Sequence, residues 1–262
     1  MNEELANIKG TRVSITGDGR PVVLIHGVFM DSRMWAPQIE RLSHSYRVCC
    51  MNMLGHGDAP DPDGERTLQD FVEQLHDIIQ HFGEDKPVLG GFSMGGLVAQ
   101  AYAVRHHLNL SDLILMNTVY DRSDAEVEVV KQRYADLTAG GIESIVQSAS
   151  QRWFTDLDRE TVPERIEEIL GWMHSGPFAA KHKAYPVFAY GDKKITGKLD
   201  QISCPALIMT GSDDLGSTPL MAEKMASSIP DSTLHIVSGQ RHMMPFLESN
   251  LVNETILGFL KT

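Results

Sequence analysis

The stretch VLGGFSMGGLVA, residues 88–99, places a single serine, Ser93, between two pairs of glycines. The apolar residues before it are typical of a buried strand, and the residues from Leu97 onward are typical of a helix. A strand that turns directly into a helix strains its central residue, and side chains at the flanking positions would collide with the neighbouring strand or helix. Gly91 and Gly95 therefore predict a sharp strand–turn–helix element that exposes the Ser93 hydroxyl.

Several other apolar runs have the length and composition of buried strands, and helical patterns lie between most of them. Because these runs are continuous and not alternating, we expect both faces of each strand to be covered. This alternation predicts an α/β fold with a mostly parallel sheet and helices on both faces. The runs are Pro21–Ile25, Arg47–Met51, 87–89, 113–116, 206–209 and 233–237.

Two segments depart from the alternation of strands and helices. Thr11–Thr16, followed by Gly-Asp-Gly at 17–19, predicts a hairpin strand at an antiparallel edge. Residues 120–198 contain no convincing strand, and amphipathic segments follow one another at 125–137, 142–154 and 163–173. We expect this part to be a helical lid inserted after the sixth strand, with the core formed by residues 1–119 and 199–262. Most lid aromatics should pack within the lid, and some should line an apolar pocket beneath it.

The composition excludes several classes of partner. The 262 residues carry a formal charge of −12 and no cluster of Lys and Arg, which argues against nucleic acid or an anionic membrane. No basic segment followed by an apolar one begins the chain, so we expect a cytoplasmic protein. Cys49, Cys50 and Cys204 are expected to be reduced and buried, and no Cys/His pattern has zinc spacing. The composition leaves open whether the protein forms a homo-oligomer.

Three turns that follow strands carry reactive residues, and ligands of parallel sheets bind beyond the carboxyl ends of the strands. The motif G-x-S-x-G makes Ser93 the expected nucleophile. A serine hydroxyl needs a base, and His242 is the one histidine in a loop just after a late strand. The base needs an orienting acid, and the turn after the strand at 206–209 offers Asp213 and Asp214 as alternatives.

An oxyanion hole needs backbone N–H groups fixed where negative charge develops. We expect one from Met94, at the start of the helix after Ser93, and the other from Val28 in the loop after Pro21–Ile25. Phe29, in the same loop, is expected to contact the substrate. His26 in that loop is expected to be structural. The site requires neither a metal nor an organic cofactor.

Together these residues resemble the α/β-hydrolase superfamily over nearly the whole chain. The similarity lies in His26-Gly27, Gly55-His56-Gly57, Gly91-Phe92-Ser93-Met94-Gly95, Gly211-Ser212-Asp213-Asp214 and His242 with Pro245. In the G-x-x-D turn of the family the acid falls on Asp214, so the resemblance favours Asp214 over Asp213. Relatives often read D-x-x-G-H-G-x-S where this chain has Asn52 and Ala59, a change expected to alter local hydrogen bonding and not the chemistry.

Within the superfamily the chain is most similar to lidded carboxylesterases and 3-oxoadipate enol-lactonases. The resemblance implies a serine esterase or lactonase that cleaves a small carboxylic ester or lactone through Ser93, His242 and Asp214. A serine at position 93 argues against the haloalkane dehalogenase branch, which uses aspartate. Hydrolysis of a C–C bond, thioester hydrolysis and acyl transfer would use the same triad and stay open. A ligand-binding receptor on a hydrolase scaffold is the alternative from a different class.

Overall fold

The computed structural model describes residues 3–261 and contains an eight-stranded sheet with the order β1-β2-β4-β3-β5-β6-β7-β8. From β4 to β8 the strands pair in parallel, which confirms the predicted α/β architecture. The strands are β1 (Glu3–Ile8), β2 (Thr11–Thr16), β3 (Pro21–Ile25), β4 (Arg47–Met51), β5 (Val88–Phe92), β6 (Asp112–Met116), β7 (Ala206–Gly211) and β8 (Ser232–Val237).

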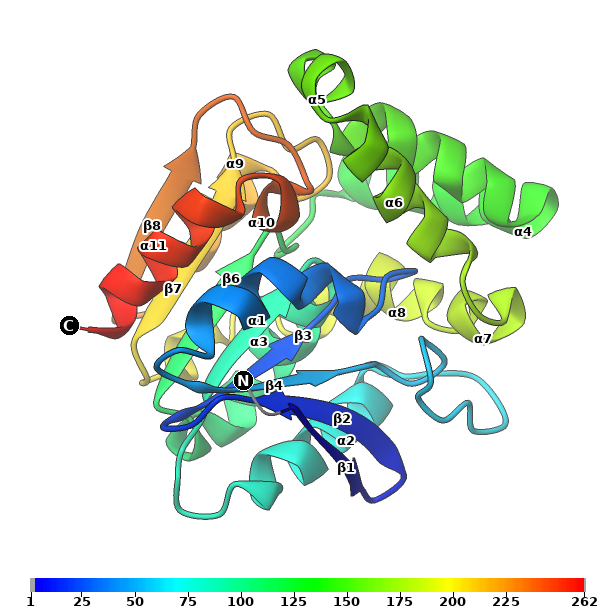
Figure 1. The fold of residues 1–262 in the computed structure, drawn as a ribbon. Helices are drawn as coiled ribbons and strands as arrows, with labels where there is room; N and C mark the ends of the chain where they lie inside the picture. Colours follow the sequence, from blue (N-terminus) through cyan, green and yellow to red (C-terminus); the bar gives the residue numbers. More distant parts are fainter. Residues whose placement is uncertain (1–2, 262) are drawn as a thin grey trace.

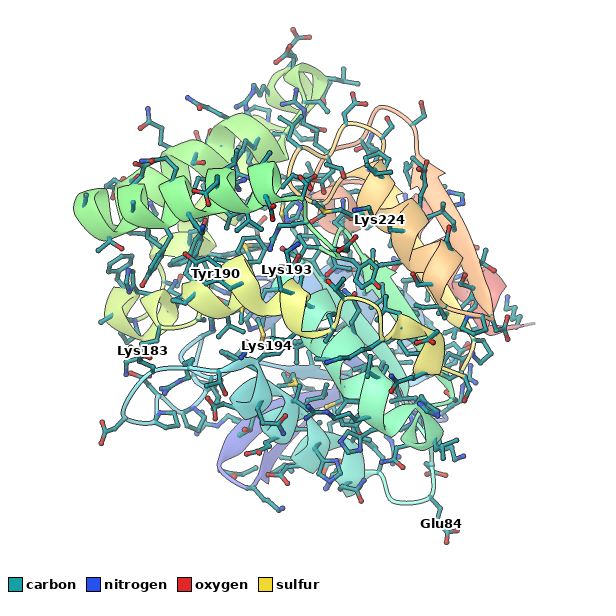
Figure 2. The ribbon with its side chains drawn as sticks, turned by 180° about the vertical axis from the view of Figure 1, so that it is seen from behind. Glu84, Lys183, Tyr190, Lys193, Lys194 and Lys224 are labelled. Atoms are coloured by element: carbon teal, nitrogen blue, oxygen red, sulfur yellow. The ribbon has the colours of Figure 1, made fainter. Side chains whose placement is uncertain are left out.

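Helices cover both faces of the sheet, as the strand–helix alternation predicts (Figure 1). On one face α1 (Ala36–Leu42) packs against α11 (Ser249–Leu260). On the other face lie α2 (Leu68–His81), α3 (Met94–His106) and α9 (Pro219–Ser228), which Figure 2 shows from behind. The shorter elements are η1 (Ser32–Trp35), η2 (His107–Asn109), η4 (Leu199–Gln201) and α10 (Met244–Leu247).

A group of helices between β6 and β7 lies over one end of the sheet (Figure 1). Its members are α4 (Asp124–Trp153), α5 (Asp156–Thr161), α6 (Pro163–His174), α7 (Phe178–His182), α8 (Tyr185–Tyr190) and η3 (Gly191–Lys194). We call this group the lid. α4 is two helices joined at Gly141, whose φ of 66° and ψ of −157° are not helical. This break falls in the gap between the amphipathic segments expected at 125–137 and 142–154.

Salt bridges and hydrogen bonds tie the base of the lid to the core. Arg122, just before α4, pairs with the fully buried Asp192 of η3 at 3.0 Å. Lys193 donates a hydrogen bond to the backbone of Arg122, and Lys224 of α9 reaches Asp121 at 3.0 Å. Figure 2 labels both lysines at this junction. The two ends of the lid are therefore joined to each other and to the core.

The structure corrects two expectations about the sheet. The hairpin partner of β2 is β1, which the sequence analysis did not predict, and the turn between them is at Lys9-Gly10 and not at 17–19. β2 lies between β1 and β4, so β1 is the edge strand. β8 is the other edge of the sheet, and its residues are largely half-buried or exposed. The expectation that both its faces are covered was wrong.

The three cysteines are free and buried. Over residues 3–261, the structure has no helix that is both long and apolar enough to cross a membrane.

Candidate active site

Ser93 lies in the turn between β5 and α3 with a φ of 53° and a ψ of −116°, a conformation that costs energy for a residue other than glycine. Close packing around the turn explains the flanking glycines. A Cβ on Gly91 would lie 2.5 Å from the carbonyl oxygen of Gly95, and a Cβ on Gly95 would lie 2.4 Å from that of His26. The Ser93 amide donates to Met116 at 3.0 Å, which anchors the turn to the neighbouring strand.

His242 and Asp214 form a buried pair. Nδ1 of His242 lies 2.7 Å from Oδ2 of Asp214, so Nε2 is on the side of the ring away from the carboxylate. The other oxygen of Asp214 accepts hydrogen bonds from the amides of Gly216 and Ser217 at 2.8 and 2.9 Å. Burial alone would raise the pKa of Asp214, but the charge and hydrogen bond of His242, with the bonds to Ser217 and Asn117, lower it overall. Asp214 therefore stays ionised beside the imidazole.

Asp213 has a different environment from Asp214. It is exposed, and its carboxylate accepts a hydrogen bond from the hydroxyl of Ser212 at 2.7 Å. The amide of Asp213 donates to the carbonyl of Gln240 at 3.0 Å, which holds the turn against the His242 loop. Of the two carboxylates offered by the sequence, the structure thus brings Asp214 to His242.

Asn117 is a site residue that the sequence analysis missed. It follows β6 with a φ of 45°, and its amide donates to Met209 at 2.9 Å. Its side-chain nitrogen donates to Oδ2 of Asp214 at 2.9 Å and to the carbonyl of Arg241 at 3.3 Å. Asn117 therefore holds the acid and the His242 loop together. The available signal was a polar residue at the carboxyl end of a strand next to β5.

The loop after β3 is held by two buried imidazoles. Nε2 of His56 accepts the amide of Phe29 at 3.1 Å, and Nε2 of His26 accepts the amide of Met53 at 3.0 Å. Burial lowers the pKa of His26 to about 4. Burial, together with the neighbouring His26 ring, lowers the pKa of His56 well below its usual range. Both rings are therefore neutral hydrogen-bond acceptors, and His26 joins the loop after β3 to the loop after β4.

Of the two residues expected to form the oxyanion hole, Met94 directly follows Ser93 and Val28 lines the same cavity as Ser93. In the part of the chain that the structure describes, neither the Val28 amide nor the Met94 amide has a hydrogen-bond acceptor. The Met94 amide also begins α3, where the helix dipole favours negative charge. The Phe29 amide donates to His56, so Phe29 can contribute only its ring to the cavity that Ser93 and His242 line.

Ser93 and His242 line one small cavity of about 30 Å³ beneath the lid. This is roughly the space of one water molecule. Trp153 of α4 lies on the His242 ring, with the ring centroids 5.5 Å apart. The remaining lining residues are Val28, Phe29, Arg133, Ile145, Arg152, Met173, Tyr185, Phe188, Gly216 and Ser217.

The lid and the His242 loop are hydrogen-bonded to each other. The Arg241 guanidinium donates to the carbonyls of Phe154 and Gln151 at 2.8 and 3.2 Å. These bonds place the end of α4, and with it Trp153, against His242. Among residues 3–261, no His, Cys, Asp and Glu side chains cluster in a way that could hold a metal ion.

Comparison with known proteins agrees with this arrangement of strands and turns. A family model described as alpha/beta hydrolase fold matches residues 20–249. The chain is 32% identical to (E)-2-((N-methylformamido)methylene)succinate hydrolase of Acinetobacter baylyi, over 99% of this chain and 97% of that protein. It is 25% identical to 3-oxoadipate enol-lactonase 2 of the same organism, over 87% and 84% of the two chains.

A solved structure of a thermophilic esterase from Thermogutta terrifontis, with malate bound, superposes with a TM-score of 0.87 at 28% identity. The superposition covers 100% of this chain and 98% of the esterase. The relatives confirm the predicted resemblance to esterases and enol-lactonases. The chain therefore belongs to the α/β-hydrolase family and is a hydrolase.

Proposed function

We propose that the protein is a serine hydrolase that cleaves a small carboxylic ester or lactone. The observation that carries the proposal is the buried His242–Asp214 pair, whose imidazole shares a cavity with a serine on a strained turn. The Ser93 hydroxyl shares its cavity with a base, and the base has an ionised partner that fixes its tautomer.

In the proposed mechanism, Ser93 Oγ attacks the substrate carbonyl while Nε2 of His242 takes the hydroxyl proton. Asp214 accepts the Nδ1–H of the same ring and stabilises the imidazolium that forms. The amides of Val28 and Met94 donate to the oxyanion. His242 then gives its proton to the leaving oxygen, which leaves an acyl-enzyme. A water molecule, deprotonated by His242, hydrolyses the acyl-enzyme, and the proton returns to Ser93.

The esterase and the enol-lactonase among the relatives support an ester or lactone as the substrate. A second candidate is hydrolysis of another acyl bond by the same residues. It is favoured by the 32% identical relative, whose printed substrate name is that of neither an ester nor a lactone. Thioester hydrolysis, C–C bond hydrolysis and acyl transfer belong to this second group.

Labelling with a fluorophosphonate and a panel of 4-nitrophenyl esters and lactones of graded acyl length test the proposal. Ser93→Ala should lose labelling and at least about 10³-fold in kcat. Ser227→Ala removes an exposed hydroxyl on α9 and is the matched control, expected to keep both. Hydrolysis that survived Ser93→Ala, or labelling at a different residue, would show that the proposal is wrong. Thioesters and amides in the same panel separate the second candidate.

A further inference from the structure

The cavity that holds Ser93 and His242 also holds two arginines from the lid, Arg133 and Arg152. Arg133 is in the first half of α4 and Arg152 is at its end, with the break at Gly141 between them. The two halves of α4 thus each contribute one arginine to the lining of the same small cavity.

Neither guanidinium has a carboxylate partner among residues 3–261. Arg152 Nε donates to the neutral hydroxyl of Ser148 at 3.2 Å, and Arg133 has no hydrogen-bond acceptor in the same described part of the chain. Arg122, at the base of the same lid, shows the contrast, because it pairs with Asp192 at 3.0 Å. The chain has 35 acidic residues against 23 basic ones, so unpaired neighbouring arginines do not reflect a shortage of acids.

The charge of Arg133 acts on Arg152. Arg133 and Arg152 are half-buried, and burial together with the charge of Arg133 lowers the pKa of Arg152 to about 10. Arg152 is therefore still charged at neutral pH. The carboxylate of Asp214 acts in the opposite direction, but it already accepts hydrogen bonds from His242, Asn117 and the turn after β7. Positive charge held partly away from water, as on Arg152, is costly unless a counter-charge pairs with it.

We propose that Arg133 and Arg152 form a carboxylate subsite, and that the substrate is a small ester or lactone carrying a free carboxylate. This inference rests on the proposed function and names its substrate class. A guanidinium presents parallel N–H groups that match the two oxygens of a carboxylate. With the reacting carbonyl at Ser93 and the carboxylate at the arginines, the carbon skeleton between them lies against apolar side chains. These are Phe29, Ile145, Trp153, Met173 and Phe188.

The names of the relatives support the same class of substrate. One relative is named as the hydrolase of a succinate derivative and another as the enol-lactonase of 3-oxoadipate, and the esterase structure contains malate. Succinate, oxoadipate and malate are all carboxylates.

The test compares pairs of substrates that differ only in charge. Mono-4-nitrophenyl glutarate and adipate carry a free carboxylate, and their methyl esters are the neutral counterparts. We expect the protein to favour the charged member at least tenfold in kcat/KM. Arg133→Gln and Arg152→Gln should each lower this ratio at least tenfold, chiefly by raising KM for the charged ester. Arg152→Lys keeps the positive charge but loses the paired N–H donors of the guanidinium, so it should give an intermediate ratio.

Lys131→Gln is the matched control. It removes a positive charge from an exposed position of α4, outside the cavity, so the ratio should stay unchanged. Equal hydrolysis of both esters by the wild type, or a ratio that survives both arginine substitutions, would overturn the subsite and leave the proposed hydrolase standing.

A separate binding experiment covers the case in which neither ester is hydrolysed. Calorimetric titration of glutarate into Ser93→Ala then tests the arginines without catalysis. Binding that is lost when Arg133→Gln and Arg152→Gln are added would support the subsite although the proposed function had failed. Undetectable binding, or binding that persists in the triple variant, would overturn it.

Discussion

Asp213 and Asp214 are adjacent and chemically identical, yet their surroundings give them different capabilities. Asp214 is buried, accepts four hydrogen bonds, from His242, Asn117, Gly216 and Ser217, and has a lowered pKa. Asp213 is exposed and contacts Ser212. Only a carboxylate in the position of Asp214 can hold the Nδ1–H of the imidazole and leave Nε2 free to accept a proton.

This difference yields a paired prediction for the proposed hydrolase. Asp214→Asn replaces an acceptor with a group that also donates, which favours the wrong tautomer of His242, so kcat should fall by about 10³–10⁴. Asp213→Asn should change kcat by less than threefold. Both are measured on the ester that the wild type hydrolyses fastest, with circular dichroism to show that each variant is folded. A large loss in Asp213→Asn alone would reverse the assignment of the acid.

At the scale of the element, the decisive feature is the break in α4. Gly141 has φ 66° and ψ −157°, a region almost restricted to glycine. Gly171 in α6 is a matched contrast, since it is in the same lid, its φ is not positive, and a Cβ there would meet open space. The break matters because it lets residues from both halves of α4 line one cavity. An unbroken helix of this length would hold its two ends apart along a single axis.

Gly141→Ala should therefore lower the free energy of unfolding by about 1–3 kcal/mol. Gly171→Ala should raise it by up to about 1 kcal/mol, since alanine is favoured over glycine inside a helix. Urea unfolding of both variants gives the comparison. If the carboxylate subsite is correct, Gly141→Ala should also lower the preference for charged esters, because it displaces Arg133 relative to Arg152. Equal stability of the two variants would show that the break is not needed.

At the scale of the whole molecule, the lid closes the site and buried histidines join the loops of the core. The cavity at Ser93 has about 30 Å³, so an ester substrate of the proposed kind would need this cavity to widen beneath the lid. By contrast, hydrogen bonds hold the loops after β3 and β4 in place. They are bonded to each other through His26 and His56, whose rings accept backbone amides from the opposite loop.

These two imidazoles predict a loss of stability in acid. The folded-state pKa of His26, about 4, lies below its unfolded value of about 6.5, so the unfolded chain binds more protons between these values. Stability is therefore full above pH 6.5 and falls as the pH drops toward 4. His26 alone should cost about 2 kcal/mol between pH 7 and pH 5.

Urea unfolding across this range, with NMR titration of the ring protons, measures both parts of the prediction. The His26 and His56 resonances should stay unchanged to pH 5 in the folded protein, with the urea-unfolded chain as the reference. Titration of either ring near pH 6.5 in the folded state would contradict it.

The sequence by itself determined the parallel sheet, the strand–turn–helix element around Ser93, and the helical segments of the lid. These depend on local properties, namely the periodicity of apolar residues and the steric demands of a turn that only Gly91 and Gly95 meet. The resemblance to α/β-hydrolases extended this to Asp214. Sequence reasoning did not find β1, because half of its six residues are polar, most are exposed, and the strand is defined by its pairing with β2.

The tertiary structure alone decided which polar groups meet. Asn117 reaches Asp214 across 97 positions of sequence, and Arg133 and Arg152 reach the cavity only because α4 breaks at Gly141 and folds over the sheet. No local sequence pattern predicts these contacts, because hydrogen bonding and charge pairing here depend on distances between segments that are remote in sequence. The chain's own pattern specifies its elements, and the packing of the lid on the core specifies the surroundings of Ser93.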